Sequence, residues 1–74
     1  MAYYTTVKTV NSDGRPVKAE VICGGTSRGF TNESTGELSF ELSSNDSYSV
    51  SAKRYGERAS GNVYGGKTLV LRLQ

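Results

Sequence analysis

The stretch Thr35-Gly36-Glu37-Leu38-Ser39-Phe40-Glu41-Leu42 carries the pattern that decides the fold. Its first two residues are a turn signal, because glycine adopts the positive φ angles that tight turns need. After the turn, polar and apolar residues alternate one by one, which places the apolar side chains on one face of an extended chain. The alternation predicts a β-strand over residues 37–42 with one buried face.

The same period of two recurs along the chain, and turn-forming residues separate the runs. Further strands are predicted over residues 3–10, 17–23, 30–31, 48–53 and 68–73. The turn signals between the runs lie at residues 11–16, 24–29, 43–46, 55–56 and 65–66. No segment shows the pattern of a capped helix of about ten residues. The sequence therefore predicts one all-β domain over residues 1–74, a small antiparallel β-sandwich of six or seven strands.

Composition limits what such a domain does. The chain has 74 residues, a formal net charge of +2, one cysteine and no histidine. A chain this short buries only about 60% of the surface that its unfolded form exposes, so its core is thin and leaves no room for a deep catalytic cleft. The lone cysteine, Cys23, forms no disulfide within the chain. Its alternation with Val21 predicts a buried thiol, with a reactive or intermolecular thiol as the alternative.

The turn and core residues follow a recognisable order. The order runs Asp13-Gly14-x-Pro16-Val17-x-Ala19-x-Val21, Phe30-Thr31, Thr35-Gly36-x-Leu38-x-Phe40-x-Leu42, Tyr48-x-Val50-x-Ala52 and Gly56. It resembles the carboxypeptidase regulatory-like domains, over about Val7 to Leu73. The resemblance implies a transthyretin-like seven-stranded sandwich, and an immunoglobulin-like sandwich is the alternative. It also implies a non-enzymatic accessory or spacer domain, because its motifs hold turn and core residues and no catalytic ones.

No combination of residues predicts catalysis. Residues 61–68 match the string of a phosphate-binding P-loop, but the chain continues as a strand where that loop needs a helix. Glu37 and Glu41 lie about 13 Å apart along one strand, too far apart to share a proton. With no histidine and one cysteine, the chain has neither a base beside a nucleophile nor a zinc-ligand cluster. We predict no enzyme activity, no cofactor, no metal site and no nucleotide binding.

The densest basic stretch is Lys53-Arg54-Tyr55-Gly56-Glu57-Arg58. A tyrosine among basic residues can stack on a nucleic-acid base. Here a glutamate interrupts the positive charges, and the other basic residues are spread along the chain. Because nucleic-acid binding depends on clustered positive charge, the stretch is interpreted as a solvated hairpin turn.

Exposed tyrosines are the remaining candidates for a binding surface, because their rings contact both sugars and proteins. The residues proposed to contact a protein partner or a glycan are Tyr3, Tyr4, Arg28, Tyr55 and Tyr64. A shallow groove bordered by both Tyr55 and Tyr64 would favour a carbohydrate. An unpaired, flat strand edge would favour a protein.

Two hypotheses about function follow. The first is a non-catalytic structural or protein-interaction module, an accessory domain of a surface, secreted or virion-like assembly. It would bind a protein partner, or a second copy of itself, through an edge strand, with the terminal strands 3–10 and 67–73 as candidates. The alternative is a small carbohydrate-binding module that uses the tyrosines.

The sequence also bears on location. Residues 1–6 have neither the basic nor the apolar region of a signal peptide. No run approaches the roughly 20 apolar residues of a membrane span, so we expect no membrane insertion. An extracellular or cell-surface location, as part of a longer chain, is favoured.

Overall fold

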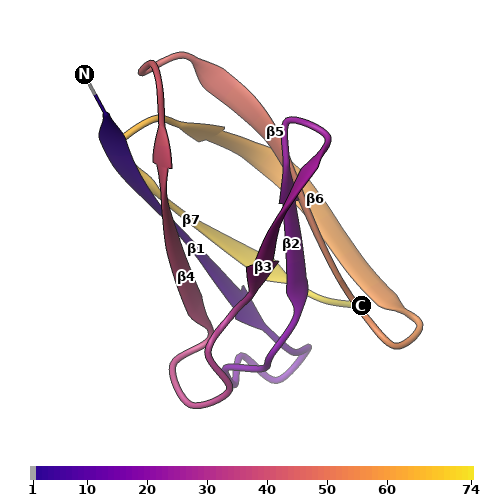
Figure 1. Ribbon diagram of the computed structural model, residues 1–74. Coiled ribbons are helices and arrows are strands. Elements are labelled where there is room, and N and C mark those ends of the chain that lie inside the picture. Colours follow the sequence, from indigo (N-terminus) through magenta and orange to yellow (C-terminus); the bar gives the residue numbers. More distant parts are fainter. Residues whose placement is uncertain (1) are drawn as a thin grey trace.

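A computed structural model describes residues 2–74 as two facing β-sheets (Figure 1). The strands are β1 (Tyr3–Val10), β2 (Glu20–Cys23), β3 (Thr26–Phe30), β4 (Glu37–Leu42), β5 (Ser47–Arg54), β6 (Glu57–Tyr64) and β7 (Thr68–Arg72). Sheet A has the strand order β4-β1-β7, and sheet B has the order β3-β2-β5-β6. All neighbouring strands are antiparallel except β1 and β7, which run parallel. The predicted all-β sandwich is confirmed, and residues 2–74 contain no helix able to cross a membrane.

The core lies between the sheets and comes from the predicted alternation. On every strand except β3, alternate side chains point inward, so the two inner faces meet as one apolar layer. The buried members of this layer are Val7, Ala19, Val21, Cys23, Leu42, Val50, Ala52, Val63, Leu71 and Leu73. Leu38, Phe40 and Tyr48 pack against them but stay partly exposed.

The turn that precedes β4 is as tightly constrained as the sequence suggested. Gly36 has a φ angle of +72° and is buried. A Cβ atom at this position would lie 2.5 Å from the carbonyl oxygen of Thr9 and 3.0 Å from Cβ of Pro16. Only glycine satisfies both the left-handed backbone and the lack of space.

The prediction of a loop over residues 24–29 followed by a strand at 30–31 is wrong. Gly24 and Gly25 alone make the turn, with φ angles of +62° and +84°, and β3 starts directly after them. β3 shows no alternation of apolar and polar residues because it is an outer strand of its sheet and most of its side chains are exposed. A strand with no buried face has no apolar period to detect.

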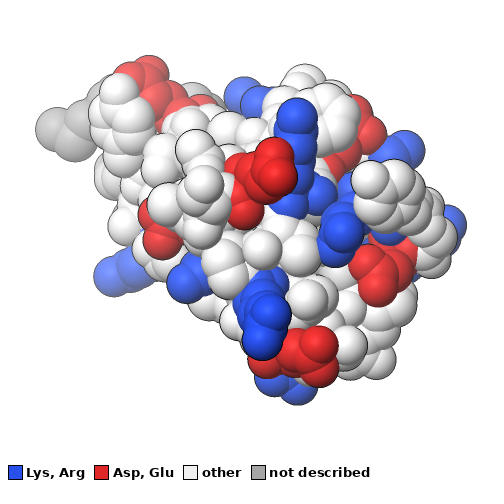
Figure 2. Space-filling model, turned by 90° about the horizontal axis from the view of Figure 1, so that it is seen from below, with Lys and Arg blue, Asp and Glu red and all other residues white. Residues whose placement is uncertain are grey.

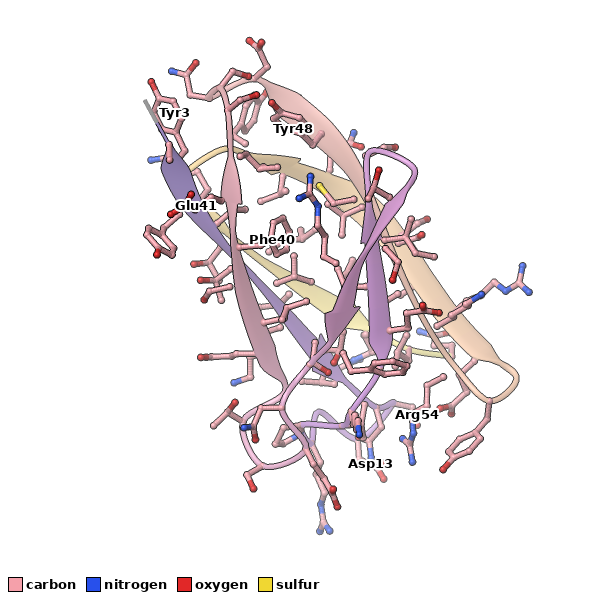
Figure 3. The ribbon with its side chains drawn as sticks, in the orientation of Figure 1. Tyr3, Asp13, Phe40, Glu41, Tyr48 and Arg54 are labelled. Carbon is pink, nitrogen blue, oxygen red and sulfur yellow. The ribbon has the colours of Figure 1, made fainter. Side chains whose placement is uncertain are left out.

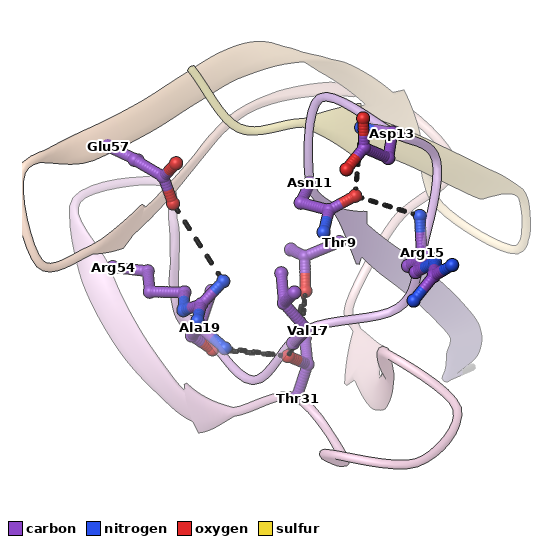
Figure 4. Close-up of polar contacts among 9 residues, drawn as sticks. All are labelled: Thr9, Asn11, Asp13, Arg15, Val17, Ala19, Thr31, Arg54 and Glu57. Carbon is purple, nitrogen blue, oxygen red and sulfur yellow. Dashed lines mark hydrogen bonds and ion pairs between the residues drawn. The ribbon is translucent and has the colours of Figure 1, made fainter.

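The strand predicted over residues 17–23 begins only at residue 20. The backbone N–H of Ala19 donates to the Thr31 hydroxyl at 2.9 Å, and the N–H of Val17 donates to the Thr9 carbonyl at 3.2 Å. The buried hydroxyls of Thr9 and Thr31 lie 2.8 Å apart, and Thr9 also donates to the Val17 carbonyl at 2.7 Å (Figure 4). The Thr9 and Thr31 hydroxyls, together with the Thr9 carbonyl, therefore supply the bonds that a strand ladder would have made.

The terminal strand β1 is not an edge. It lies in the middle of sheet A, between β4 and β7. The hypothesis that residues 3–10 pair across an interface is therefore wrong, because both sides of this strand are already occupied. The outer strands are β4 and β7 in sheet A and β3 and β6 in sheet B.

Candidate functional site

The sandwich has one closed and one open side (Figure 1). On the closed side β6 approaches β7, where the N–H of Arg58 donates to the Gln74 carbonyl at 3.1 Å and the N–H of Gln74 donates to the Arg58 carbonyl at 3.4 Å. On the open side the outer strands β3 and β4 face each other, and within residues 2–74 no backbone hydrogen bond joins them. The open side is therefore where the backbone has unused bonding capacity.

Two side chains span the open side. The pairing of β2 with β3 shifts between Val21 and Ile22, so Arg28 is an extra residue of a β-bulge. Its guanidinium carbon lies 5.4 Å from the ring centre of Phe40 on β4. Phe40 points from β4 into the space between the sheets (Figure 3). A cation over an aromatic ring thus takes the place of a strand pairing here.

The backbone of β4 has free bonding groups on its outer side. The N–H of Thr6 donates to the Lys67 carbonyl at 3.1 Å, so every second residue of β1 directs its backbone groups toward β7. The intervening residues of β1 form backbone hydrogen bonds with β4, and one of them, Thr5, pairs with Phe40. The neighbours Ser39 and Glu41 consequently direct their N–H and C=O groups to the free edge.

The side chains of β4 sort by face. Leu38 and Phe40 point inward and are partly exposed, while Glu37 and Glu41 point outward and are exposed. Glu37 lies opposite Lys8 of β1 in the strand register. The free edge therefore combines an apolar inner face with an acidic outer face.

A hollow lies at the lower end of the molecule, where the loops after β1, β3 and β5 meet. It is a cleft of about 860 Å³, lined by Pro16, Val17, Lys18, Ala19, Glu20, Phe30, Glu33, Lys53, Arg54 and Tyr55. The Lys18 amine lies 5.4 Å from the Phe30 ring centre, and the Arg54 guanidinium lies 5.1 Å from that of Tyr55. Basic and acidic groups lie side by side over this end (Figure 2), so it presents no single sign of charge.

The five residues proposed as contacts do not form one site. Tyr55 is 94% exposed on the β5–β6 turn, whereas Tyr64 is 60% exposed at the opposite end of the eight-residue strand β6. Tyr3 and Tyr4 begin β1, and Arg28 lies on the open side. Tyr55 lines the lower cleft and Tyr64 does not, so the shared groove that would favour a glycan between them is absent from the described residues.

Cys23 is buried, as predicted. Burial raises the pKa of its thiol, and the positive charge of Arg28 lowers that pKa by a smaller amount. The protonated thiol is the favoured form, which suits a small core residue. Within residues 2–74 no group of three or more Cys, Asp or Glu residues is arranged to hold a metal ion.

These features define a small β-sandwich with one open side and a mixed-charge cleft at one end. Comparison of the chain with protein-family models, with curated proteins and with solved structures finds no match. The resemblance to the carboxypeptidase regulatory-like domains stays a prediction based on turn and core residues.

Proposed function

We propose that this chain is a non-catalytic protein-interaction module that binds an extended segment of a partner along the free edge of β4. The free edge itself carries the proposal, because its unpaired N–H and C=O groups are a template for an added strand. β4 is regular over its six residues and has no proline. β3, the other free edge, is less suitable because its bulge and the φ of +112° at Gly29 disturb the strand.

The side chains of β4 indicate what kind of segment fits. An added strand continues the pleat, so the residues beside Leu38 and Phe40 point into the sandwich and those beside Ser39 and Glu41 point outward. At Glu37 the edge is already occupied, because the Glu37 carbonyl accepts from the N–H of Asn32 at 3.0 Å. Apolar side chains at the inward-pointing positions of the added strand would cover the exposed part of Phe40. Basic side chains at its outward-pointing positions would lie near the carboxylates of Glu37 and Glu41, with each such cross-strand pair contributing about 0.2–1 kcal/mol. The partner is therefore a segment of alternating apolar and basic residues.

A second copy of this chain fits the edge poorly. Two antiparallel pairings of β4 with its own copy overlap equally, one centred on Ser39 and the other on Phe40. The first places Glu37 opposite Glu41, and the second places the two Glu41 side chains diagonally across from each other. Like charges lie close together in both pairings, which opposes association. We expect light scattering to give the mass of a monomer across a hundredfold range of concentration.

A synthetic peptide of alternating valine and lysine tests the proposal. We expect it to slow hydrogen exchange at the amides of Ser39 and Glu41 and to shift the resonances of β4. Ser39→Pro should abolish these effects, because proline removes the outward N–H while leaving the bonds to β1 intact. Ser39→Ala is the matched control. It also loses the hydroxyl, which lies 2.9 Å from that of Thr6, but it keeps the N–H and should bind normally.

A charge reversal gives an independent check that does not depend on proline. Glu37→Lys combined with Glu41→Lys should weaken binding of the valine–lysine peptide and allow binding of a valine–glutamate peptide. Failure of the valine–lysine peptide to bind the unaltered protein at millimolar concentration would refute strand addition at β4. Protection of β3 amides instead of β4 amides would also refute it.

A further inference from the structure

The outer face of the β5–β6 hairpin, on the solvent side of sheet B, has a pattern that the β4 edge does not explain. Every second side chain of the two strands points to solvent, and the strand register groups these side chains into four rows. The rows are Lys53 with Arg58, Ser51 with Ser60, Ser49 with Asn62, and Ser47 with Tyr64. The rows span about 20 Å at two residues per step.

The first row places two positive charges directly opposite each other. Lys53 has one acidic neighbour, with its amine 3.7 Å from a carboxylate oxygen of Glu20, while Arg58 forms no ion pair with residues 2–74. Like charges in direct cross-strand register destabilise a sheet unless an anion lies between them. Together with Ser51 and Ser60 the two basic residues line a shallow depression of about 390 Å³. The depression can hold an anionic group with hydroxyl donors beside it.

The two middle rows hold four small polar side chains. Neither these four nor Ser47 forms a side-chain hydrogen bond with another residue in the described part of the chain. On the outer face of sheet A the hydroxyls of Thr6 and Ser39 bond each other instead. The β5–β6 face thus keeps its donors and acceptors free for a ligand rich in hydroxyls.

The last row ends in an aromatic ring. Tyr64 is 60% exposed and lies on the same face as the basic pair, at the other end of the hairpin. An exposed tyrosine offers a flat apolar surface with a hydroxyl at its rim, which suits stacking against a sugar ring. Charge, hydroxyl groups and ring therefore follow one another along one line.

We infer that the outer face of the β5–β6 hairpin binds an acidic oligosaccharide. A sulfate or carboxylate group of the sugar lies between Lys53 and Arg58, the sugar hydroxyls bond the serine and asparagine side chains, and a further sugar ring stacks on Tyr64. This surface belongs to sheet B and shares no residue with the free edge of β4, so each proposal stands or fails alone.

A sulfated hexasaccharide prepared from heparin is the probe, with its fully desulfated counterpart as comparison. We expect a Kd below about 1 mM for the sulfated form, at least about tenfold weaker binding of the desulfated form, and amide shifts confined to β5, β6 and the adjoining part of β2. Lys53→Gln with Arg58→Gln should weaken binding at least about tenfold. Glu20→Gln should strengthen binding, because Lys53 then has no competing carboxylate.

Matched variants on the other sheet separate this site from general attraction between opposite charges. Lys8→Gln with Arg72→Gln removes the same charge from the outer face of sheet A and should change the Kd less than about twofold. Tyr64→Ser should weaken binding several-fold, and Tyr4→Ser should not. Equal losses in the two charge variants would overturn the inference. So would inorganic sulfate binding as tightly as the hexasaccharide, or amide shifts that map to the lower cleft.

Discussion

The two long sides of the sandwich differ in how they are held together. On the closed side, backbone bonds join Arg58 to Gln74, and the N–H of the fully buried Leu73 donates to the Val10 carbonyl at 2.8 Å. On the open side, Arg28 over Phe40 is a contact between side chains only. A domain this small buries little apolar surface in its core. It places its backbone pairing on one side and leaves the facing edges of β3 and β4 unpaired on the other.

If this contrast is correct, losing a side chain should cost far more on the closed side. Leu73→Ala removes a fully buried side chain, and we expect a loss of about 2–5 kcal/mol in the free energy of unfolding. Phe40→Ala removes a larger but partly exposed side chain, so about 1–2 kcal/mol is expected. Urea denaturation of both variants measures the difference. Equal losses would mean that the open side is as well packed as the closed one.

Thr31 lies in the loop from β3 to β4, at one end of the open side. Its hydroxyl bonds the N–H of Ala19 and the carbonyl of Val17. Thr31→Val would leave the Ala19 N–H without its acceptor in a buried place, so a loss of about 1–3 kcal/mol is expected. Thr6→Val, which removes an exposed hydroxyl, is the control and should change stability by less than about 0.5 kcal/mol. If Thr31→Val is no worse than the control, the open side is held by other contacts.

The smallest expected effect is a pH dependence from Cys23, next to the open side. Burial raises the pKa of this thiol in the folded protein above its value in the unfolded chain. As the pH rises through the interval between the two values, the unfolded chain loses the proton first, so the free energy of unfolding falls. Cys23→Ala should flatten the stability curve in this alkaline interval. Identical slopes in both proteins would show that the thiol titrates alike when folded and unfolded.

The sequence predicted the strands that bury one face and expose the other. β4, β5 and β7 were located within one or two residues because Leu38, Val50 and Leu71 alternate with polar neighbours. β3 was missed because it buries no regular face. β6 was implied only by its flanking turns, since its inward positions include the small residues Ala59 and Gly61, which give a weak apolar period.

The candidate surfaces were harder to foresee, because they depend on which strands are neighbours. Nothing in the sequence orders β4 at the edge of sheet A, so its free backbone groups could not be predicted. The pairing of Lys53 with Arg58 was within reach, because the predicted turn at Tyr55-Gly56 has two residues and fixes the register of the hairpin. Residues 53–58 were interpreted as a solvated turn, because the order of residues along the chain shows only that Glu57 interrupts the positive charges.

The parallel pairing of β1 with β7 also has a consequence for folding. Thr6 pairs with Thr68, so sheet A is completed only when β1 pairs with β7, a strand about 60 residues later in the sequence. Pairing over such a separation must overcome the entropy of closing a long loop before any contact compensates for it. During synthesis sheet A stays incomplete until β7 has left the ribosome. Until that point, one edge of β1 is unpaired and exposed. We expect slow, all-or-none folding and aggregation of nascent chains that stop before residue 68.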